Sequence, residues 1–251
     1  MNTARPGKAA DDQALLELPD EVLVRQARHL VLPQMGPAGQ LRLTQAHVAL
    51  VGMGGIGCPA AQYLAASGVG QLTLIDDDVV ETSNLGRQIL FSQADVGRPK
   101  VEAAAQRLAA NNPLVKIQAA SQRLEADNAL QLLGSCDLIL DGSDNHETRL
   151  LSASTAATAK IGLLSASVIG VEGQLVVQGP SDSQGYEQIF PTLSARQGNC
   201  ADEGVLSPAA GMVGTLAACI ALQVLAQGWS SLEGQVALIS AWPPNIMWIS
   251  A

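Results

Sequence analysis

Hydrophobic and polar positions along the first half of the chain form two recurring patterns, short apolar runs and longer stretches with helical spacing. The apolar runs His47–Val51, Leu72–Ile75 and Val115–Ala119 have the length of buried strands. The stretches Ile56–Ser67 and Lys100–Asn111 lie between them and predict helices. Strands that alternate with helices are typical of a parallel sheet covered on both faces. The pattern therefore predicts an α/β fold with a doubly wound, Rossmann-like, mainly parallel sheet.

The alternation continues to about residue 166 and then changes. We expect a helix over Ala126–Leu133, a strand within "CDLILDGSDN", a helix over His146–Lys160 and a short strand over Gly162–Ala166. Beyond them, "VEGQLVVQGP" and "GQVALISAWPPNIMWISA" alternate as antiparallel strands do, the second pair being joined by a turn at Pro243–Asn245. We therefore expect antiparallel strands to continue the sheet on its C-terminal side.

The remaining stretches define the expected domain organisation. Residues 1–19 have no apolar core, so we expect a flexible tail rather than a secretory signal. Asp20–Val31 predicts an amphipathic helix capped by Asp20, and Met212–Leu225 is too short for a membrane span and predicts a buried helix. Residues 20–251 should form a single domain, with one half at about 47–166, a second half at about 167–251, and a long loop over 180–208.

Composition and charge narrow the class of protein. Of the 251 residues, 47% are hydrophobic and only 15% are charged, which excludes a disordered chain. The net charge is −9 and no basic cluster is present, so nucleic-acid binding is not expected. We expect a cytoplasmic protein without membrane association, and the four cysteines form no C-x-x-C pair that would indicate a disulfide or zinc site. In so acidic a chain, each Lys or Arg near a binding motif is informative.

A glycine motif follows the first predicted strand. Gly52, Gly54 and Gly57 form a G-x-G-x-x-G pattern, and Asp76 follows at the end of the next strand. In nucleotide-binding sheets such glycines admit the phosphates and the acid binds the ribose. The glycines alone do not distinguish NAD from ATP.

Three charged residues favour ATP chemistry. Cleaving the α–β bond of ATP needs cations and a metal around the phosphates, whereas hydride transfer needs neither. Arg87 follows the second strand, Lys100 begins a helix, and Asp144 follows the fourth strand, where it could order Mg²⁺. Taken singly, the two cations could be surface residues and Asp144 a helix cap. Together, at one edge of the sheet, they indicate a triphosphate site.

Four segments carry a resemblance to a known family. "GMGGIG", "LIDDDVVETSNLGRQ", "VGRPKVEAA" and "DGSDN" resemble the MoeB/ThiF adenylyltransferases, including HesA-like proteins, of the ubiquitin-activating enzyme superfamily. The resemblance covers Asp20–Ala251. It implies that MgATP adenylates the C-terminal glycine carboxylate of a small ubiquitin-like sulfur carrier of the MoaD/ThiS type with a Gly-Gly end, releasing pyrophosphate. It also implies that the carrier binds the antiparallel half and that a separate protein donates sulfur for molybdopterin, thiamine or a related pathway.

The resemblance also implies roles for individual residues. Asp76 would bind the ribose, the backbone near Gly54 would approach the phosphates, and Asp144 would bind Mg²⁺. Arg28, in "RQARH", would reach into the ATP site of the other subunit, so a homodimer is expected. The full ATP-binding set implied in this way is Gly52, Gly54, Gly55, Gly57, Asp76, Asp78, Asn84, Arg87, Gln88 and Lys100, with Arg87, Lys100, Asp144 and Arg28 taking part in catalysis.

The cysteines depart from the family pattern. Many members hold a structural zinc between two C-x-x-C pairs, but the two matching regions here read "DSQGYEQIF" and "WPPNIMWISA". We therefore expect a variant without the zinc cysteines and without zinc. Cys200 matches a loop cysteine that some relatives use to handle sulfur or to form a covalent carrier intermediate, although adenylation itself does not need it. Cys58, Cys136 and Cys219 are expected to be packed core residues.

Two other classes of function stay open at this point. An NAD-dependent oxidoreductase fits the glycine motif but leaves Arg87 and Lys100 unexplained. A non-catalytic relative that binds the carrier without turnover would fit the loss of the zinc cysteines, although Arg87, Lys100 and Asp144 are all retained.

Overall fold

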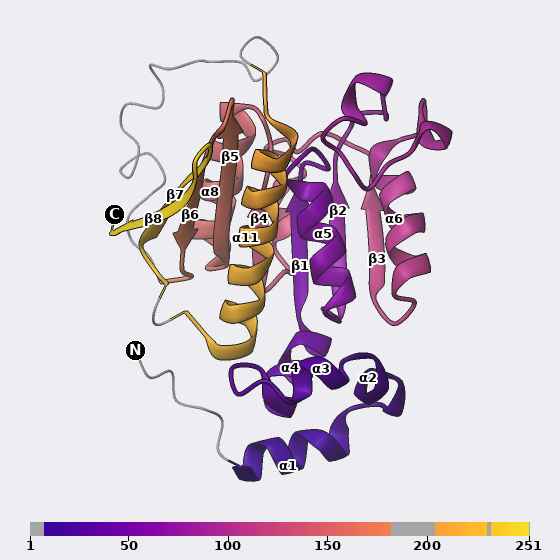
Figure 1. Cartoon of the computed structure of the whole chain (residues 1–251), viewed down its shortest axis with the longest axis vertical. Helices are drawn as coiled ribbons and strands as arrows, with labels where there is room; N and C mark the ends of the chain where they lie inside the picture. The colour runs from indigo at the N-terminus through magenta and orange to yellow at the C-terminus, as the bar shows by residue number, and fades with distance from the viewer. Residues whose placement is uncertain (1–7, 182–203, 230–231, 251) are drawn as a thin grey trace.

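The computed structural model describes residues 8–181, 204–229 and 232–250, which build one sheet with helices on both faces (Figure 1). The strand order is β3-β2-β1-β4-β5-β6-β7-β8. The strands are β1 (His47–Val51), β2 (Gln71–Ile75), β3 (Lys116–Ala120), β4 (Leu138–Asp141), β5 (Gly162–Ile169), β6 (Glu172–Gln178), β7 (Gln235–Ala241) and β8 (Pro244–Ser250).

The directions of the strands confirm the predicted architecture. The strands from β3 to β5 are parallel, whereas β6, β7 and β8 each pair antiparallel with their neighbour. One sheet thus runs through both expected halves of the domain, and the expected boundary near residue 166 falls inside β5. The strand order reverses between β1 and β4, which is where doubly wound sheets open a binding crevice.

Helices cover the two faces of the sheet unequally. The helices are α1 (Lys8–Glu17), α2 (Asp20–Arg25), α3 (Ala27–Leu30), α4 (Gly36–Gln45), α5 (Gly57–Ala66), α6 (Lys100–Asn111), α7 (Ala129–Leu133), α8 (His146–Ala159) and α11 (Ser207–Gln227), with short 3₁₀ turns η1 (Thr82–Asn84) and η2 (Gln93–Asp95). In Figure 1, α5, α6 and α11 lie in front of the sheet and α8 lies behind it, while α1 to α4 lie beneath the amino ends of the strands.

The central strands are buried on both faces, which explains their continuous apolar runs. Leu50 of β1 and Leu140 of β4 belong to the core beneath α5, α6 and α11. Ala49 and Ile139, one position earlier in each strand, belong to the second core beneath α7 and α8. Side chains alternate across the sheet in this way because a strand has a period of two residues.

Helix α11 is the one helix in the described ranges that is long and apolar enough to cross a membrane by length and composition. It packs against α5 and α4 and against strands of the sheet, and 56% of its most apolar window is buried. A Cβ atom on Gly214 would lie 2.3 Å from the Ile56 carbonyl oxygen, so this glycine permits close contact between α11 and α5. One expectation for this helix is wrong, because Cys219 lies on its exposed side rather than in the core.

The N-terminal region differs most from expectation. Instead of a loose tail up to residue 19, α1 occupies Lys8–Glu17 and packs on α4. Ala14 is buried, and the buried Asp11 accepts a hydrogen bond from the Ala38 backbone N–H (3.2 Å). Asp11 thus satisfies a free N–H in the first turn of α4. An acid that caps another helix leaves no local signal in the sequence, so this segment looked like a polar tail.

Two further elements of this region also differ from the pattern. The helix expected over Asp20–Val31 is interrupted at Gln26, which is buried and donates a hydrogen bond to the Ala66 carbonyl oxygen (2.8 Å). Helix α4 was not predicted, because its sequence "GPAGQLRLTQ" contains two glycines and a proline. Tertiary contacts therefore decide the structure of this region more than local propensity does.

Candidate functional site

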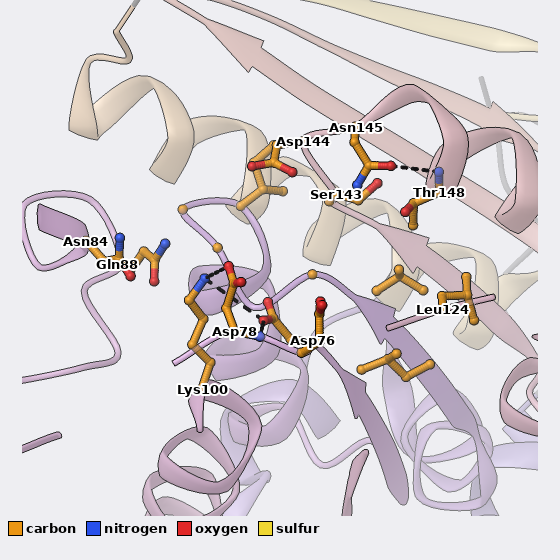
Figure 2. Close-up of a pocket in the computed structure, with 18 of the residues that line it drawn as sticks. Asp76, Asp78, Asn84, Gln88, Lys100, Leu124, Ser143, Asp144, Asn145 and Thr148 are labelled. Carbon is orange, nitrogen blue, oxygen red and sulfur yellow. Dashed lines mark hydrogen bonds and ion pairs between the residues drawn. The ribbon is translucent and has the colours of Figure 1, made fainter. Parts of the chain in front are cut away.

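A cavity of about 380 Å³ opens at the carboxyl ends of β1, β2 and β4 (Figure 2). It lies at the point where the strand order reverses, as expected for a doubly wound sheet. Its walls come from the glycine turn after β1, the acidic loop after β2, the 84–88 segment, the start of α6 and the loop between β4 and α8. The structure therefore brings more than five separate segments of the sequence to one place.

The glycine turn is shaped by two close contacts. Gly52 has φ +88°, and a Cβ atom there would lie 3.1 Å from the backbone of Gly142 and Ser143. A Cβ atom on Gly57 would lie only 2.0 Å from the Gly52 carbonyl oxygen. Gly54, by contrast, faces open space, with Gln88 Nε2 as its nearest neighbour at 4.0 Å. Two glycines are thus needed to fold the turn, and Gly54 leaves its backbone open to a ligand.

Asp76 lies at the end of β2 against the glycine turn. One carboxylate oxygen accepts a hydrogen bond from the Met53 N–H (2.7 Å) and the other accepts one from the Asp78 N–H (2.9 Å). Burial raises the pKa of the Asp76 carboxyl, although the nearby Lys100 ammonium and the two backbone hydrogen bonds oppose this rise. Asp76 is therefore a fixed hydrogen-bond acceptor on the wall of the cavity.

Lys100 begins α6 and its ammonium group is directed at the acidic loop. Lys100 Nζ lies 2.7 Å from Asp78 Oδ2 and 4.0 Å from Asp76 Oδ1, and its side chain is only 7% exposed (Figure 2). The backbone supports this position, since Lys100 N–H donates to the Asp78 carbonyl oxygen (3.0 Å). The predicted cation is thus in place, paired with two of the predicted acids.

The turn η1 and the residues that follow it supply further polar groups. Asn84 is buried and accepts a hydrogen bond from the Glu81 N–H (3.1 Å). Gln88 is also buried, and its Oε1 atom has no hydrogen-bond partner among the described residues. Arg87 is half-buried and donates from Nη1 to the Ser83 carbonyl oxygen (3.3 Å). All three line the cavity, as the sequence predicted, and Gln88 Oε1 could accept a hydrogen bond from a ligand.

Asp144 reaches the cavity from the loop between β4 and α8. Its side chain is exposed, whereas the following Asn145 caps α8 by accepting a hydrogen bond from the Thr148 N–H (2.9 Å). The alternative role for Asp144, that of a helix cap, is therefore wrong, because Asn145 caps α8. Carboxylates are the ligands that Mg²⁺ prefers, usually one or two from the protein together with phosphate oxygens and water. The exposed Asp144 carboxylate fits this requirement, and the three acids Asp76–Asp78, whose carboxylate oxygens lie within 4.8 Å of one another, form a separate acidic group on the cavity wall.

Other lining residues were missed by the sequence interpretation. Arg149, in the first turn of α8, donates from Nε (3.1 Å) and Nη2 (2.6 Å) to the Ser143 carbonyl oxygen. Gln122, Arg123 and the buried Leu124 line the cavity beyond β3. Arg149 gave no signal because its partner is a backbone carbonyl oxygen. The residues after β3 gave no signal because their segment contains no motif.

Gly57 shapes the glycine turn without lining the cavity, and two other predicted site residues are not found there in the described structure. Arg28 is exposed on α3, beneath the amino ends of the strands and therefore at the opposite edge of the sheet (Figure 1). Within one chain it cannot reach the nucleotide site, so its expected role would require a second subunit. Cys200 lies outside the described residues. Cys58 and Cys136 are buried as expected, and burial raises the pKa of each thiol to about 12, so neither is a nucleophile at neutral pH.

Fold and site together define a protein of the doubly wound α/β class with a polar cavity at the point where the strand order reverses. The chain belongs to the ThiF family, whose family model matches residues 26–249. This match confirms the resemblance to the MoeB/ThiF group of the ubiquitin-activating enzyme superfamily.

Curated relatives share this region at substantial identity. The chain is 43% identical over 238 residues to the Sus scrofa adenylyltransferase and sulfurtransferase MOCS3, covering 94% of this chain and 51% of the relative. It is 40% identical over 237 residues to the Emericella nidulans adenylyltransferase and sulfurtransferase uba4, covering 90% of this chain and 48% of the relative. The chain thus spans about half the length of the curated relatives it matches.

Solved structures share the fold. A crystal structure of E. coli MccB with ATP has a TM-score of 0.78 at 22% identity, covering 98% of this chain and 79% of that one. A crystal structure of PaaA has a TM-score of 0.77 at 24% identity, covering 93% of this chain and 74% of that one. These likenesses confirm the predicted architecture.

Proposed function

We propose that this protein is an ATP-dependent adenylyltransferase that activates the C-terminal carboxylate of a small ubiquitin-like sulfur carrier. The observation that carries the proposal is the convergence of Arg87, Lys100 and Asp144 on one cavity beside an open glycine turn. The names of the MOCS3 and uba4 relatives support it. An NAD-dependent oxidoreductase would not need this set of cations and an exposed acid.

Within this proposal, each wall of the cavity binds a different part of ATP. Asp76 accepts hydrogen bonds from the ribose hydroxyls, with Asp78 beside it, and the backbone of the glycine turn approaches the phosphates. Asn84, Arg87, Gln88 and Lys100 surround the triphosphate, where their positive and amide groups offset its charge. Lys100 is already held at the cavity wall by Asp78, so little reorganisation is needed when a phosphate arrives.

Asp144 would hold Mg²⁺, which would neutralise charge on the phosphate oxygens. In the reaction, one bond to the α-phosphorus forms and one bond breaks. An oxygen of the carrier carboxylate attacks the α-phosphorus, a carboxyl–phosphate bond forms, and the bond from the α-phosphorus to the bridging oxygen breaks. Pyrophosphate leaves with that electron pair. The role of Arg87 and Lys100 is to stabilise the charge that develops on the leaving phosphates.

The carrier itself would bind the antiparallel half of the sheet. Its Gly-Gly end would enter the cavity beside Val168 and Val205, which line the wall next to β5 and before α11. The exposed apolar residues of β8 would contact the folded part of the carrier. Carrier recognition and ATP binding would thus occupy different strands of one sheet.

The remaining features of the proposal concern the oligomeric state, the cellular location, zinc and the source of sulfur. The protein would act as a cytoplasmic homodimer in which Arg28 of one subunit reaches the cavity of the other, since that residue lies far from the cavity of its own chain. No zinc would be bound, because the second candidate region, residues 242–251, contains no cysteine. Sulfur would come from a separate protein, and Cys200 would handle sulfur or form a covalent carrier intermediate after adenylation.

The proposal is tested by ATP–pyrophosphate exchange against a panel of small carriers that end in Gly-Gly. We expect exchange with at least one carrier and none with the same carrier bearing a C-terminal amide. Arg87→Ala should abolish the exchange, whereas Arg25→Ala, on the opposite edge of the sheet, should leave exchange chemistry in place. Binding of a nicotinamide cofactor without binding of ATP would refute the proposal, and carrier binding without exchange would identify a non-catalytic relative.

A further inference from the structure

We propose that Asp141 and Arg149 are positioning residues. They hold the loop between β4 and α8 in the conformation that places Asp144 at the cavity. The inference rests on the proposed function for the role of Asp144, but the holding of the loop is a property of the free protein. Neither residue needs to touch the nucleotide, because both act on the backbone of Ser143, the residue next to Asp144.

One acidic and one basic side chain form hydrogen bonds with the backbone of Ser143. Asp141 Oδ1 accepts a hydrogen bond from the Ser143 N–H at 2.8 Å. Arg149 donates two hydrogen bonds to the Ser143 carbonyl oxygen, from Nε at 3.1 Å and from Nη2 at 2.6 Å. The two bonds from the Arg149 guanidinium are charge-assisted and about twice as strong as neutral ones, and together with the bond to Asp141 they hold both polar groups of this residue.

Other contacts fix the two sides of the same loop. Gly142 N–H donates to the Val51 carbonyl oxygen (2.9 Å), and the glycine turn packs so tightly that a Cβ atom on Gly52 would lie 3.1 Å from Ser143 N. Asn145 closes the other end by capping α8. The loop is therefore held on both flanks and at Ser143, while the Asp144 side chain alone is left exposed.

Fold stability does not account for these two side chains. Asp141 is fully buried, and its Oδ2 atom has no hydrogen-bond partner in the described part of the chain, which makes its burial costly. Arg149 lies in the first turn of α8, where the helix dipole disfavours a cation. Both residues thus stand where their placement carries a cost, and their side-chain hydrogen bonds go to the loop that carries the exposed acid.

Hydrogen–deuterium exchange of the free protein tests the inference directly. We expect amide exchange at residues 142–145 to rise about tenfold in Arg149→Met and in Asp141→Ala, because each variant removes a charged hydrogen-bond partner. Asp141→Asn keeps an acceptor and should retain protection, and Arg149→Lys should lie between Arg149→Met and the unchanged protein. Arg25→Met is the matched control, since Arg25 also donates to a backbone carbonyl oxygen, that of Asn111 (3.1 Å), at the far edge of the sheet.

A second measurement links the loop to the metal. Binding of Mn²⁺ in the presence of a non-hydrolysable ATP analogue should weaken about tenfold in Asp141→Ala, which alters a residue outside the cavity lining, while binding of the analogue without metal should change less than twofold. Unchanged amide hydrogen exchange at residues 142–145 in both Arg149→Met and Asp141→Ala would overturn the inference. An equal rise in amide hydrogen exchange at these residues in Arg25→Met would also overturn it. Amide hydrogen exchange does not depend on catalysis. If residues 142–145 are protected as expected but the protein has no adenylation activity, this inference stands and only the proposed function is refuted.

Discussion

The parallel and antiparallel halves of this sheet share hydrogen bonds but present very different surfaces. In the parallel half, β1 and β4 are buried along their length, and polar groups gather only where the strands end. In the antiparallel half, every residue of β8 is exposed, and its centre is apolar. The first arrangement suits a small, highly charged ligand held by a few fixed groups. The second suits a folded partner that covers an apolar edge.

Strand β8 is apolar on both of its faces. Ile246 pairs with Ile239 and Met247 pairs with Leu238, so the two residues lie on opposite faces of the sheet. Their exposed fractions are 43% and 52%. Natural proteins usually protect such an edge strand with charges or a covering element, and an apolar edge that no described helix or strand covers is typical of an interaction site. Variants that alter only one half of the sheet therefore test whether the two halves bind different ligands.

The largest effect is expected in the parallel half, for Lys100→Ala. Removing a cation that is already held beside Asp78 should lower carrier-dependent pyrophosphate exchange by about 100- to 1000-fold, the usual cost of losing one preorganised charge-stabilising group. Lys116→Ala, an exposed lysine on β3, is the charge-matched control and should stay within twofold of the unchanged protein. Equal losses in the two variants would show that overall charge, rather than position, matters.

The next largest effect is expected on folding, for Gly57→Ala. The new Cβ atom would lie 2.0 Å from the Gly52 carbonyl oxygen, so the turn must shift. We expect a loss of about 2–3 kcal/mol in the free energy of unfolding, measured by urea denaturation. Gly54→Ala, with its nearest neighbour at 4.0 Å, should unfold like the unchanged protein even if nucleotide binding suffers. Equal stability of the two variants would contradict the close contact.

A smaller effect is expected in the antiparallel half. The double variant Ile246→Ser, Met247→Ser should weaken carrier binding about tenfold and leave ATP affinity unchanged, because the two residues lie on β8 and away from the cavity lining. Calorimetric titration with carrier and with ATP measures both. Leu130→Ser, which replaces a side chain 61% exposed on α7, is the matched control. Unchanged carrier affinity in the double variant would remove β8 from the proposed interface.

The smallest effect is expected from pH acting on Asp76. Because burial raises the pKa of Asp76, the folded protein takes up this proton at a higher pH than the unfolded chain does. As pH falls through that raised pKa, ATP affinity should decrease because the protonated acid is a poorer acceptor for the ribose. Over the same interval this group should increase fold stability, since the folded state binds the proton more tightly than the unfolded state. Asp76→Asn should lose both dependences in titration and thermal unfolding.

The sequence predicted the parallel half well because its signals are local. Lys100–Asn111 was predicted as a helix and is one, and β1 matches its predicted bounds. Arg87, Lys100 and Asp144 were predicted to meet because the carboxyl ends of parallel strands share one edge of a sheet. Periodicity and topology were sufficient for these residues.

The features that were missed depend on contacts between distant segments. Helix α1 is held by Asp11 against α4, and the break at Gln26 follows from a hydrogen bond to the end of α5. Cys219 was assigned to the core from an apolar sequence, but periodicity does not show which side of an apolar helix is covered. Arg149 was missed because its partner is a backbone carbonyl oxygen, which carries no sequence signal.

The central claim is that the cavity joins a carrier carboxylate to the α-phosphorus of ATP, and oxygen transfer tests it most directly. The carrier is prepared with a heavy-oxygen label in its C-terminal carboxylate and incubated with the protein, MgATP and a thiol acceptor. When the thiol displaces AMP from the activated carboxyl, the account predicts that AMP carries the label. Unlabelled AMP, or formation of ADP in place of AMP, would contradict it.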